Sequence, residues 1–274
     1  MTDLYAVIGN PIGHSKSPLI HGMFAEATGQ DLAYVAIEGS LGQFAARVDQ
    51  FRRGGGRGLN VTVPFKLDAC AYATDLSERA RLAGAVNAMK FQGELAHAEN
   101  FDGIGLTNDI QRNLGYSLAG RRILMLGAGG AARGVILPFL DQKPALLAIA
   151  NRTPDKARAL AAQFSAYGNI VGMGYGDLAG FRDFDLVVNA TSASLAGELP
   201  PVPASSFSRG CLSYELAYGK GLTPFLRVAR SAGAGLLADG VGMLVEQAAE
   251  AFEWWRGIRP DTEPVIERLT VPLI

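Results

Sequence analysis

Residue types that make crosslinks and bind metals are scarce in this sequence. Only two cysteines and three histidines occur among its 274 residues. Cys70 and Cys211 form no spaced motif, so we expect two free thiols in a reducing compartment rather than a disulfide framework. His14, His21 and His97 are scattered without metal-ligand spacing, so we expect no metal.

An excess of charge and a long apolar run are also missing. Lys and Arg number 25 against 26 Asp and Glu, which gives a net charge of −1 and does not favour nucleic acid or an anionic membrane as partner. There is no run of about 18 apolar residues, so no membrane span is expected. The start, Met1-Thr2-Asp3-Leu4-Tyr5, lacks the basic segment of a signal peptide. We therefore expect a cytoplasmic protein whose partner is a small molecule.

Glycine and apolar residues, by contrast, are abundant: 49% of the chain is hydrophobic, and 34 residues are glycine. Short apolar strand patterns alternate with helical spacing twice along the chain, which is typical of α/β domains. We predict an α/β fold with two α/β domains. Residues 1–102, completed by C-terminal helices at 238–274, form an N-terminal substrate domain, and residues 103–237 form a Rossmann-type domain.

A glycine-rich turn is the most distinctive feature of the second domain. Ile123–Leu126 has the pattern of a buried strand, and Gly127, Gly129 and Ala132 then occupy the small-residue positions of the dinucleotide-binding turn. Such a turn lets backbone N–H groups approach a pyrophosphate at the start of a helix, here expected from about Gly130 to Leu140. Because the context is right on both sides, we interpret the turn as a nucleotide site rather than an ordinary loop.

The end of the next strand indicates which dinucleotide binds. An NAD-binding fold places a carboxylate there, whereas this chain has Asn151-Arg152-Thr153 followed by Pro154. The planar cation of Arg152 suits a 2′-phosphate. The alternative is an arginine that is merely exposed on the surface, but its fixed position relative to the glycine turn favours NADP.

Polar residues in the first domain suggest a substrate site. Ser15 and Ser17 precede a helix start, where a carboxylate would meet two hydroxyls and free N–H groups. For Ser17 alone, the simpler explanation as an N-cap is favoured. Asn60 and Thr62 share one face of a predicted strand at Leu59–Val63, which is unusual unless that face is wet or binds something.

Lys66 and Asp102 are candidates for proton transfer. Lys66 follows the same strand at its carboxyl end, where ligands bind in α/β folds, and Asp102 stands at the predicted domain junction. The alternatives are that Lys66 is merely a solvated surface lysine and that Asp102 is only the N-cap of a helix over Asp102–Leu114. On the last long helix, Gln247 is a single polar residue among small and apolar ones, so it faces either a cleft or the solvent boundary.

These features together resemble the shikimate dehydrogenase family along almost the whole chain. The resemblance implies reversible, NADP-linked reduction of 3-dehydroshikimate to shikimate by a monomer or homodimer. The motifs that carry it are Gly9-Asn10-Pro11-Ile12-Gly13-His14-Ser15-Lys16-Ser17-Pro18, Asn60-Val61-Thr62-Val63-Pro64-Phe65-Lys66, Ala83-Gly84-Ala85-Val86-Asn87, Gly127–Ala131, Asn151-Arg152-Thr153 and Ala238-Asp239-Gly240-Val241-Gly242-Met243-Leu244-Val245-Glu246-Gln247-Ala248-Ala249.

The resemblance also implies roles for individual residues. Lys66 is the proton acid/base, with Asp102 beside it. The substrate-binding residues are Ser15 and Ser17 at the carboxylate, with Thr62, Asn87, Asp102, Tyr218 and Gln247 at the hydroxyls. The cofactor-binding residues are Gly127, Ala128, Gly129, Gly130 and Ala131 in the turn, Asn151, Arg152, Thr153 and Lys156 after the next strand, Leu216 and Gly240 near the nicotinamide, and Glu78 on the cofactor side.

Three motifs depart from the family pattern. Phe101 stands where the family has threonine, Ala88 replaces a second threonine, and Glu215-Leu216 replaces Asp-Met. We expect Phe101 and Ala88 to flank the substrate pocket, where a lost hydrogen-bonding group changes selectivity. Two alternatives therefore stay open: a paralogue that acts on quinate or an amino-shikimate-like ring, or that has weak shikimate activity, and a non-catalytic NADP sensor.

Overall fold

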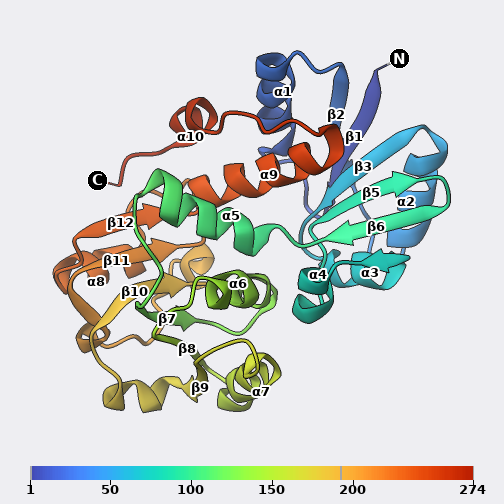
Figure 1. Ribbon diagram of the computed structural model, residues 1–274. Helices are drawn as coiled ribbons and strands as arrows, with labels where there is room; N and C mark the ends of the chain where they lie inside the picture. The colour runs from blue at the N-terminus through green and yellow to red at the C-terminus, as the bar shows by residue number, and fades with distance from the viewer. Residues whose placement is uncertain (1, 192, 274) are drawn as a thin grey trace. The chain divides into compact units, whose positions relative to one another are not determined.

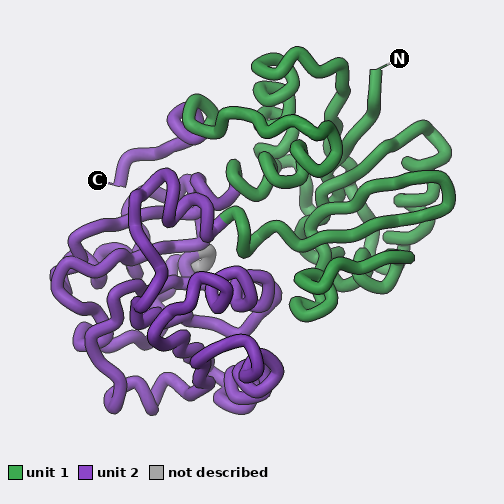
Figure 2. Tube along the Cα trace, in the orientation of Figure 1, with its two compact units in different colours: residues 1–105, 245–265 green, residues 106–244, 266–274 purple. Residues whose placement is uncertain are grey.

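The computed structural model describes residues 2–191 and 193–273, and it divides into two compact units (Figure 2). Unit 1 comprises Met1–Gly105 and Val245–Val265, and unit 2 comprises Leu106–Leu244 and Ile266–Ile274. The chain passes from unit 1 to unit 2 within α5 (Asp102–Asn108) and returns within α9 (Val241–Arg256) (Figure 1). Each unit has its own six-stranded sheet with helices packed on it, so the prediction of an α/β fold is confirmed.

The sheet of unit 1 is mixed, in the order β2-β1-β3-β5-β6-β4. The first three strands are parallel, β5 is antiparallel to both β3 and β6, and β4 is parallel to β6. The strands are β1 (Asp3–Gly9), β2 (Leu32–Glu38), β3 (Gly56–Val61), β4 (Asp75–Leu76), β5 (Ala88–Gln92) and β6 (Leu95–Glu99). Gly93 and Glu94 connect the antiparallel pair β5 and β6.

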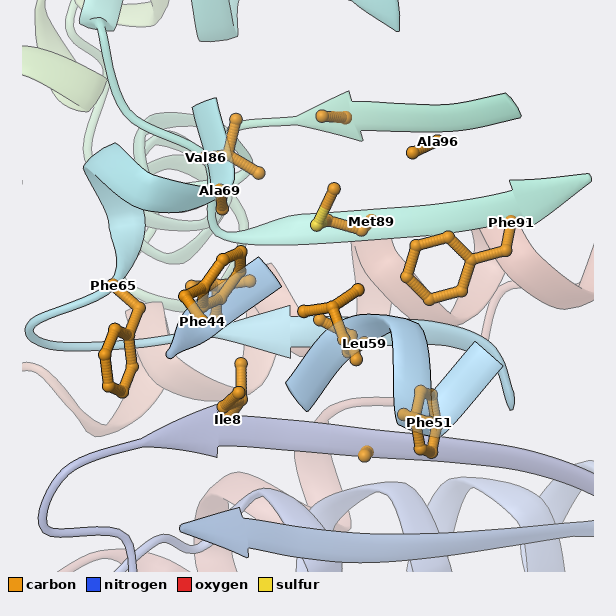
Figure 3. Close-up of a cluster of buried hydrophobic side chains, with 14 of the residues drawn as sticks. Ile8, Phe44, Phe51, Leu59, Phe65, Ala69, Val86, Met89, Phe91 and Ala96 are labelled. Atoms are coloured by element: carbon orange, nitrogen blue, oxygen red, sulfur yellow. The ribbon is translucent and has the colours of Figure 1, made fainter. Parts of the chain in front are cut away.

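Strand alternation divides the side chains of this sheet between two faces. On one face Ile8, Leu59 and Met89 pack in a core with phenylalanines of the neighbouring helices, such as Phe44 (Figure 3). On the other face Asn60 hydrogen-bonds a histidine of α1. The unit's helices include α1 (Ser17–Thr28), α2 (Phe44–Arg53), α3 (Lys66–Tyr72) and α4 (Glu78–Ala83). Asn60, a polar residue between two core residues of β3, therefore lies under α1, next to the candidate site.

The sheet of unit 2 is parallel throughout, in the order β12-β11-β10-β7-β8-β9. Numbered from β7, this is the doubly wound order of dinucleotide-binding domains, whose strand order reverses between β7 and β10. The strands are β7 (Arg122–Leu126), β8 (Leu146–Asn151), β9 (Ile170–Gly174), β10 (Phe184–Asn189), β11 (Phe207–Glu215) and β12 (Leu236–Asp239), and the main helices are α6 (Gly130–Asp141), α7 (Pro154–Phe164) and α8 (Pro224–Ser231). Ligands bind at such a reversal, which is where the glycine-rich turn lies.

Two expected elements differ from the structure. The strand predicted over Leu59–Val63 ends at Val61, because the Phe65 N–H turns back to the Thr62 carbonyl at 3.0 Å. The helix predicted over Asp102–Leu114 changes at Asp109 into a π-helical turn, Asp109–Asn113, where buried Asp109 accepts a hydrogen bond from the Tyr214 hydroxyl at 2.6 Å. Among the described residues, none of the helices is both long and apolar enough to span a membrane.

Candidate active site

An ion pair lies at the centre of the candidate site in unit 1. Lys66 is the first residue of α3, and Asp102 is the first residue of α5. Lys66 Nζ lies 2.5 Å from Asp102 Oδ2, and the two side chains are 23% and 9% exposed. The pair is therefore shielded on the carboxylate side and open to a ligand on the lysine side.

Asn87 links this pair to the last long helix. Its Nδ2 donates to Asp102 Oδ1 at 2.8 Å and lies 3.2 Å from Gln247 Oε1. Its Oδ1 accepts from the Phe101 backbone N–H at 2.8 Å, which fixes the direction of the amide. Both oxygens of Asp102 thus have partners, and the structure brings together four residues that lie far apart in the sequence, Lys66, Asn87, Asp102 and Gln247.

Hydrogen bonds of the Asn100 side chain and of the backbone hold the segments that carry these side chains. Asn100 accepts from the Asp102 N–H at 3.1 Å and donates to the Ala85 carbonyl at 3.0 Å. The Val86 N–H donates to the Lys66 carbonyl at 3.0 Å. The starts of α3, β5 and α5 are therefore tied to one another within unit 1.

Ser15, Ser17 and Thr62 lie at the ends of neighbouring elements. Ser15 Oγ accepts from the Ser17 N–H at 3.3 Å, and α1 begins at Ser17 with Lys16 as its N-cap, so the expectation that Ser17 itself is the cap is wrong. Thr62 directly follows β3. A side chain at Gly9 would clash with it, since a Cβ there would lie 2.5 Å from Thr62 Cγ2. Ser17 is buried, and its hydroxyl does not cap α1.

A buried network next to Ser17 was missed in the sequence. Asn60 Oδ1 lies 3.1 Å from His21 Nε2 and 2.7 Å from the Tyr34 hydroxyl, and the His21 and Tyr34 rings stack at 4.2 Å. Helical spacing offered one clue, since residues four apart, such as Ser17 and His21, share a helix face.

The Phe101 ring lies in an apolar cluster of unit 1. Its ring is 5% exposed and packs with Ala88 and Trp255 in an apolar cluster, with the Trp254 ring at 5.7 Å in a T-shaped contact. Only its backbone N–H faces Asn87. The large Phe101 ring thus fills core space beside the small Ala88.

The glycine-rich turn of unit 2 has the geometry of a phosphate-binding turn. Gly127 has a φ of +106°, and a Cβ there would approach the Ala190 carbonyl oxygen at 3.0 Å. Gly129 is the N-cap of α6, and no described atom lies within 4 Å of where a Cβ would stand at Gly129 or Gly130. Buried Ala132 lets α6 pack closely. A helix N-terminus with open space in front of it suits a pyrophosphate.

The segment after β8 suits a further phosphate. Arg152 is exposed, and its positive charge lowers the pKa of the nearby Tyr175, although burial raises that pKa overall. Asn151 Nδ2 donates to the Thr153 carbonyl at 3.0 Å, and Thr153 is the N-cap of α7. Lys156 lies exposed in the first turn of α7. Two cations and a helix start therefore lie together at the end of β8.

Leu216 and Gly240 lie against each other in unit 2. A Cβ at Gly240 would come within 2.2 Å of the Leu216 carbonyl oxygen, so only glycine fits at this position. Tyr218, two residues beyond Leu216, is 39% exposed. Glu78, expected on the cofactor side, belongs to unit 1 and begins α4.

Glu215 is a functional candidate that was noticed only as a departure from the family pattern. It is fully buried, and its carboxylate accepts hydrogen bonds from Asn189 Nδ2 at 3.0 Å, Ser194 Oγ and Thr223 Oγ1 at 3.2 Å. Burial raises the pKa of this carboxyl. Glu215 thereby joins the loops that follow β10 and β11, including the Leu216 segment.

Comparisons with known proteins agree with this geometry. Residues 7–89 match the shikimate dehydrogenase substrate binding domain, residues 109–196 match shikimate / quinate 5-dehydrogenase, and residues 240–270 match the shikimate 5'-dehydrogenase C-terminal domain. The shikimate dehydrogenase (NADP(+)) of Nitrosospira multiformis is 57% identical over 269 residues, which is 98% of each chain.

The chain belongs to the shikimate dehydrogenase family. Two solved structures support this. An Ael1 enzyme from Pseudomonas putida matches with a TM-score of 0.95 and 59% identity over 100% of both chains. A shikimate 5-dehydrogenase from Thermus thermophilus, in complex with NADP(H) and shikimate, matches with a TM-score of 0.86 and 32% identity over 97% of this chain and 98% of the other.

The shikimate dehydrogenase matches cover most of the residues discussed above. The substrate-binding match contains Lys66 and Asn87, the C-terminal match contains Gln247, and the central match contains the glycine-rich turn. Asp102 falls between two matched segments, so its place beside Lys66 is a result of the structure. Within residues 2–191 and 193–273, no three His, Cys, Asp or Glu side chains come together as metal ligands would.

Proposed function

We propose that this protein is an NADP-dependent shikimate dehydrogenase that reversibly reduces 3-dehydroshikimate to shikimate. The observation that carries the proposal is the Lys66–Asp102 pair, held by Asn87 and Gln247, in a chain 57% identical to a protein named shikimate dehydrogenase (NADP(+)). NADPH supplies a hydride to the carbonyl carbon when it is bound. Lys66 donates a proton to the oxygen as its negative charge develops, and in the reverse direction accepts it.

The other residues of unit 1 bind and orient the ring. Asp102 holds the Lys66 ammonium in place, and Asn87 directs its N–H groups toward the site because its oxygen is already engaged. Gln247 and Thr62 contact ring hydroxyls, as does Tyr218 of unit 2. Ser15 and Ser17 bind the carboxylate, which is the group that distinguishes this substrate from neutral cyclic ketones.

Residues of unit 2 bind the dinucleotide. The turn Gly127–Ala131 holds the pyrophosphate, and Asn151, Arg152, Thr153 and Lys156 surround the 2′-phosphate. Leu216 and Gly240 contact the nicotinamide, and Glu78 of unit 1 is a further cofactor-side residue. The cation of Arg152 and the open space before α6 support this assignment.

We also propose a cellular compartment and an assembly state for the protein. The two cysteines are free thiols, which fits the reducing cytoplasm. We propose a monomer or homodimer that has neither nucleic acid nor membrane as a partner, in keeping with the net charge of −1.

An absorbance assay of NADPH tests the proposal. Wild type and Lys66→Ala are compared with shikimate, with quinate and without substrate. Turnover of shikimate that disappears in Lys66→Ala while NADP still binds supports the proposal. Turnover of quinate alone would favour the paralogue, and NADP binding without turnover of either ring would favour a sensor. With the Phe101 ring in the core, the structural reason for an altered substrate is weaker than the sequence suggested.

A further inference from the structure

Glu215 is a buried carboxylate that is surrounded by hydrogen-bond donors. It ends β11 and is fully buried. Its oxygens accept hydrogen bonds from Asn189 Nδ2 at 3.0 Å, Ser194 Oγ, Thr223 Oγ1 at 3.2 Å and the Ala217 N–H at 3.3 Å. Within the described part of the chain, no Lys, Arg or His side chain pairs with this carboxylate. Four neutral groups thus take the place of a counter-ion.

The hydrogens of these donors are committed, so the carboxyl group is ionised at neutral pH. Asn189 Oδ1 accepts from the Thr191 hydroxyl at 2.7 Å, so its Nδ2 faces Glu215. This Nδ2 also donates to Ser194 Oγ at 3.1 Å, and Thr223 Oγ1 accepts from a backbone N–H of α8 at 3.3 Å, so both hydroxyl hydrogens point to the carboxylate. Burial raises the pKa of Glu215, but a protonated carboxyl would need an acceptor, and all four of these partners donate.

A second carboxylate lies at the same edge of the sheet of unit 2. Asp239 ends β12, where it is the register partner of Glu215. It accepts hydrogen bonds from the backbone N–H groups of Gly219 at 3.1 Å and Val241 at 3.2 Å, and no described cation pairs with it. The edge formed by the ends of β11 and β12 is therefore negatively charged.

The other half of the same edge is positively charged. Strand β8, which ends at Asn151, lies on the far side of β7 from β11, and it is followed by the exposed cations Arg152 and Lys156. The acidic residue between them, Asp155, pairs with Arg158. The carboxyl edge of this sheet thus changes sign between β8 and β11. NADP has the matching polarity, because its 2′-phosphate is an anion and its nicotinamide ring is a cation when oxidised and neutral when reduced.

We propose that Glu215 makes the nicotinamide site selective for the oxidised cofactor, by placing a buried negative charge behind the Leu216 segment. This rests on the proposed function, which places Leu216 and Gly240 at the nicotinamide. The carboxylate binds the Ala217 N–H, directly after Leu216, so its charge lies against that segment. Water screens a buried charge only weakly, so the attraction extends beyond the residues that Glu215 touches. Binding of NADP⁺ is therefore favoured over binding of NADPH, relative to a protein with a neutral side chain at this position.

Glu215→Gln tests the proposal, because it removes the charge and keeps the size of the side chain. The Kd for NADPH is measured from the fluorescence of the bound cofactor, and the Kd for NADP⁺ from its displacement of NADPH. We expect the Kd for NADP⁺ to rise about tenfold more than the Kd for NADPH, since only the oxidised ring carries a charge. The Kd for adenosine 2′,5′-bisphosphate, which lacks the nicotinamide, should keep its wild-type value.

Glu215→Asp is the matched control, because it changes the hydrogen-bond geometry and keeps the charge. Altered packing affects both Kd values, so their ratio should stay that of wild type. Glu215→Asn repeats the loss of charge in the shorter side chain, so the comparison does not depend on the folding of one variant.

Two results would overturn the inference. One is a wild-type ratio of the two Kd values in the neutral variants, Glu215→Gln and Glu215→Asn. The other is an equal shift of that ratio in Glu215→Asp, which would show that Glu215 only holds the loops in place. A wild type that binds both forms of the cofactor but does not turn over shikimate would instead refute the proposed function, and the ratio of Kd values would still decide the inference.

Discussion

Lys66 Nζ lies 2.5 Å from Asp102 Oδ2, while the other oxygen of that carboxylate accepts a hydrogen bond from Asn87. Asp102 is thus held on both sides, and its position sets that of the lysine. The two residues are 36 positions apart in the sequence and begin different helices. An ammonium held by a fixed and largely buried carboxylate suits the role that we propose for Lys66, protonation of an oxygen that gains charge during hydride transfer.

Phe101→Thr should destabilise the protein by about 3 kcal/mol without improving shikimate turnover, because it removes a buried ring and leaves a cavity. Ala88→Thr alone should also destabilise it, since the added atoms meet the Phe101 ring. The double variant should be more stable than the sum of the two effects predicts. Urea unfolding of the four proteins measures this, and strictly additive effects would show that the two positions do not share one space.

Arg152→Gln should raise the KM for NADP by about tenfold to a hundredfold and leave the KM for NAD nearly unchanged, since it removes the cation facing the 2′-phosphate. The measurement is initial rate against the concentration of each cofactor. Arg158→Gln is the control, because Arg158 lies on α7 and pairs with Asp155 at 3.3 Å. Equal losses with NADP and NAD after Arg152→Gln would contradict the assigned role.

His21 should make stability fall in acid. Its pKa is about 3 in the folded protein against about 6.5 when unfolded, so below pH 6.5 the unfolded chain binds the extra proton. The free energy of unfolding should therefore decrease as pH falls from about 6.5 toward 3, by up to about 1.4 kcal/mol per pH unit from this group. Urea unfolding of wild type and His21→Phe between pH 8 and pH 4 measures the difference.

Other titratable groups contribute equally to the pH dependence of wild type and His21→Phe. Burial raises the pKa values of Glu215 and Asp239, but both residues are present in each protein. Parallel curves for wild type and His21→Phe would show that His21 is not held neutral by the fold.

Much of unit 2 could be predicted from the sequence because its signals are local. The glycine-rich turn, the strand before it and α6 lie within one short stretch, and α6 begins at Gly130 as expected. Strand β12 was missed, since Leu236–Asp239 is short and its pairing with β11 is a contact between distant segments. Local patterns therefore recovered the cofactor turn but not the full sheet.

In unit 1, residue types were predictable but side-chain directions were not. Lys66 and Asp102 were paired correctly, since both stand at the starts of elements that meet at one edge of the sheet. The direction of the Phe101 ring depends on space left by Ala88 and on Trp254, from remote segments. Tyr34 was overlooked for the same reason, since its contact with Asn60 joins two strands of the sheet that are far apart in the sequence.

We expect the rate of NADP reduction by shikimate to depend on Lys66, because this residue transfers the proton in the proposed reaction. Lys66→Met should lower kcat by about a hundredfold to ten-thousandfold, with the Kd for NADP unchanged. The control is Lys90→Met, which removes a partly buried lysine bound to the Trp254 carbonyl and should retain wild-type kcat. A Lys66→Met protein that turns over shikimate at the wild-type rate would contradict the account.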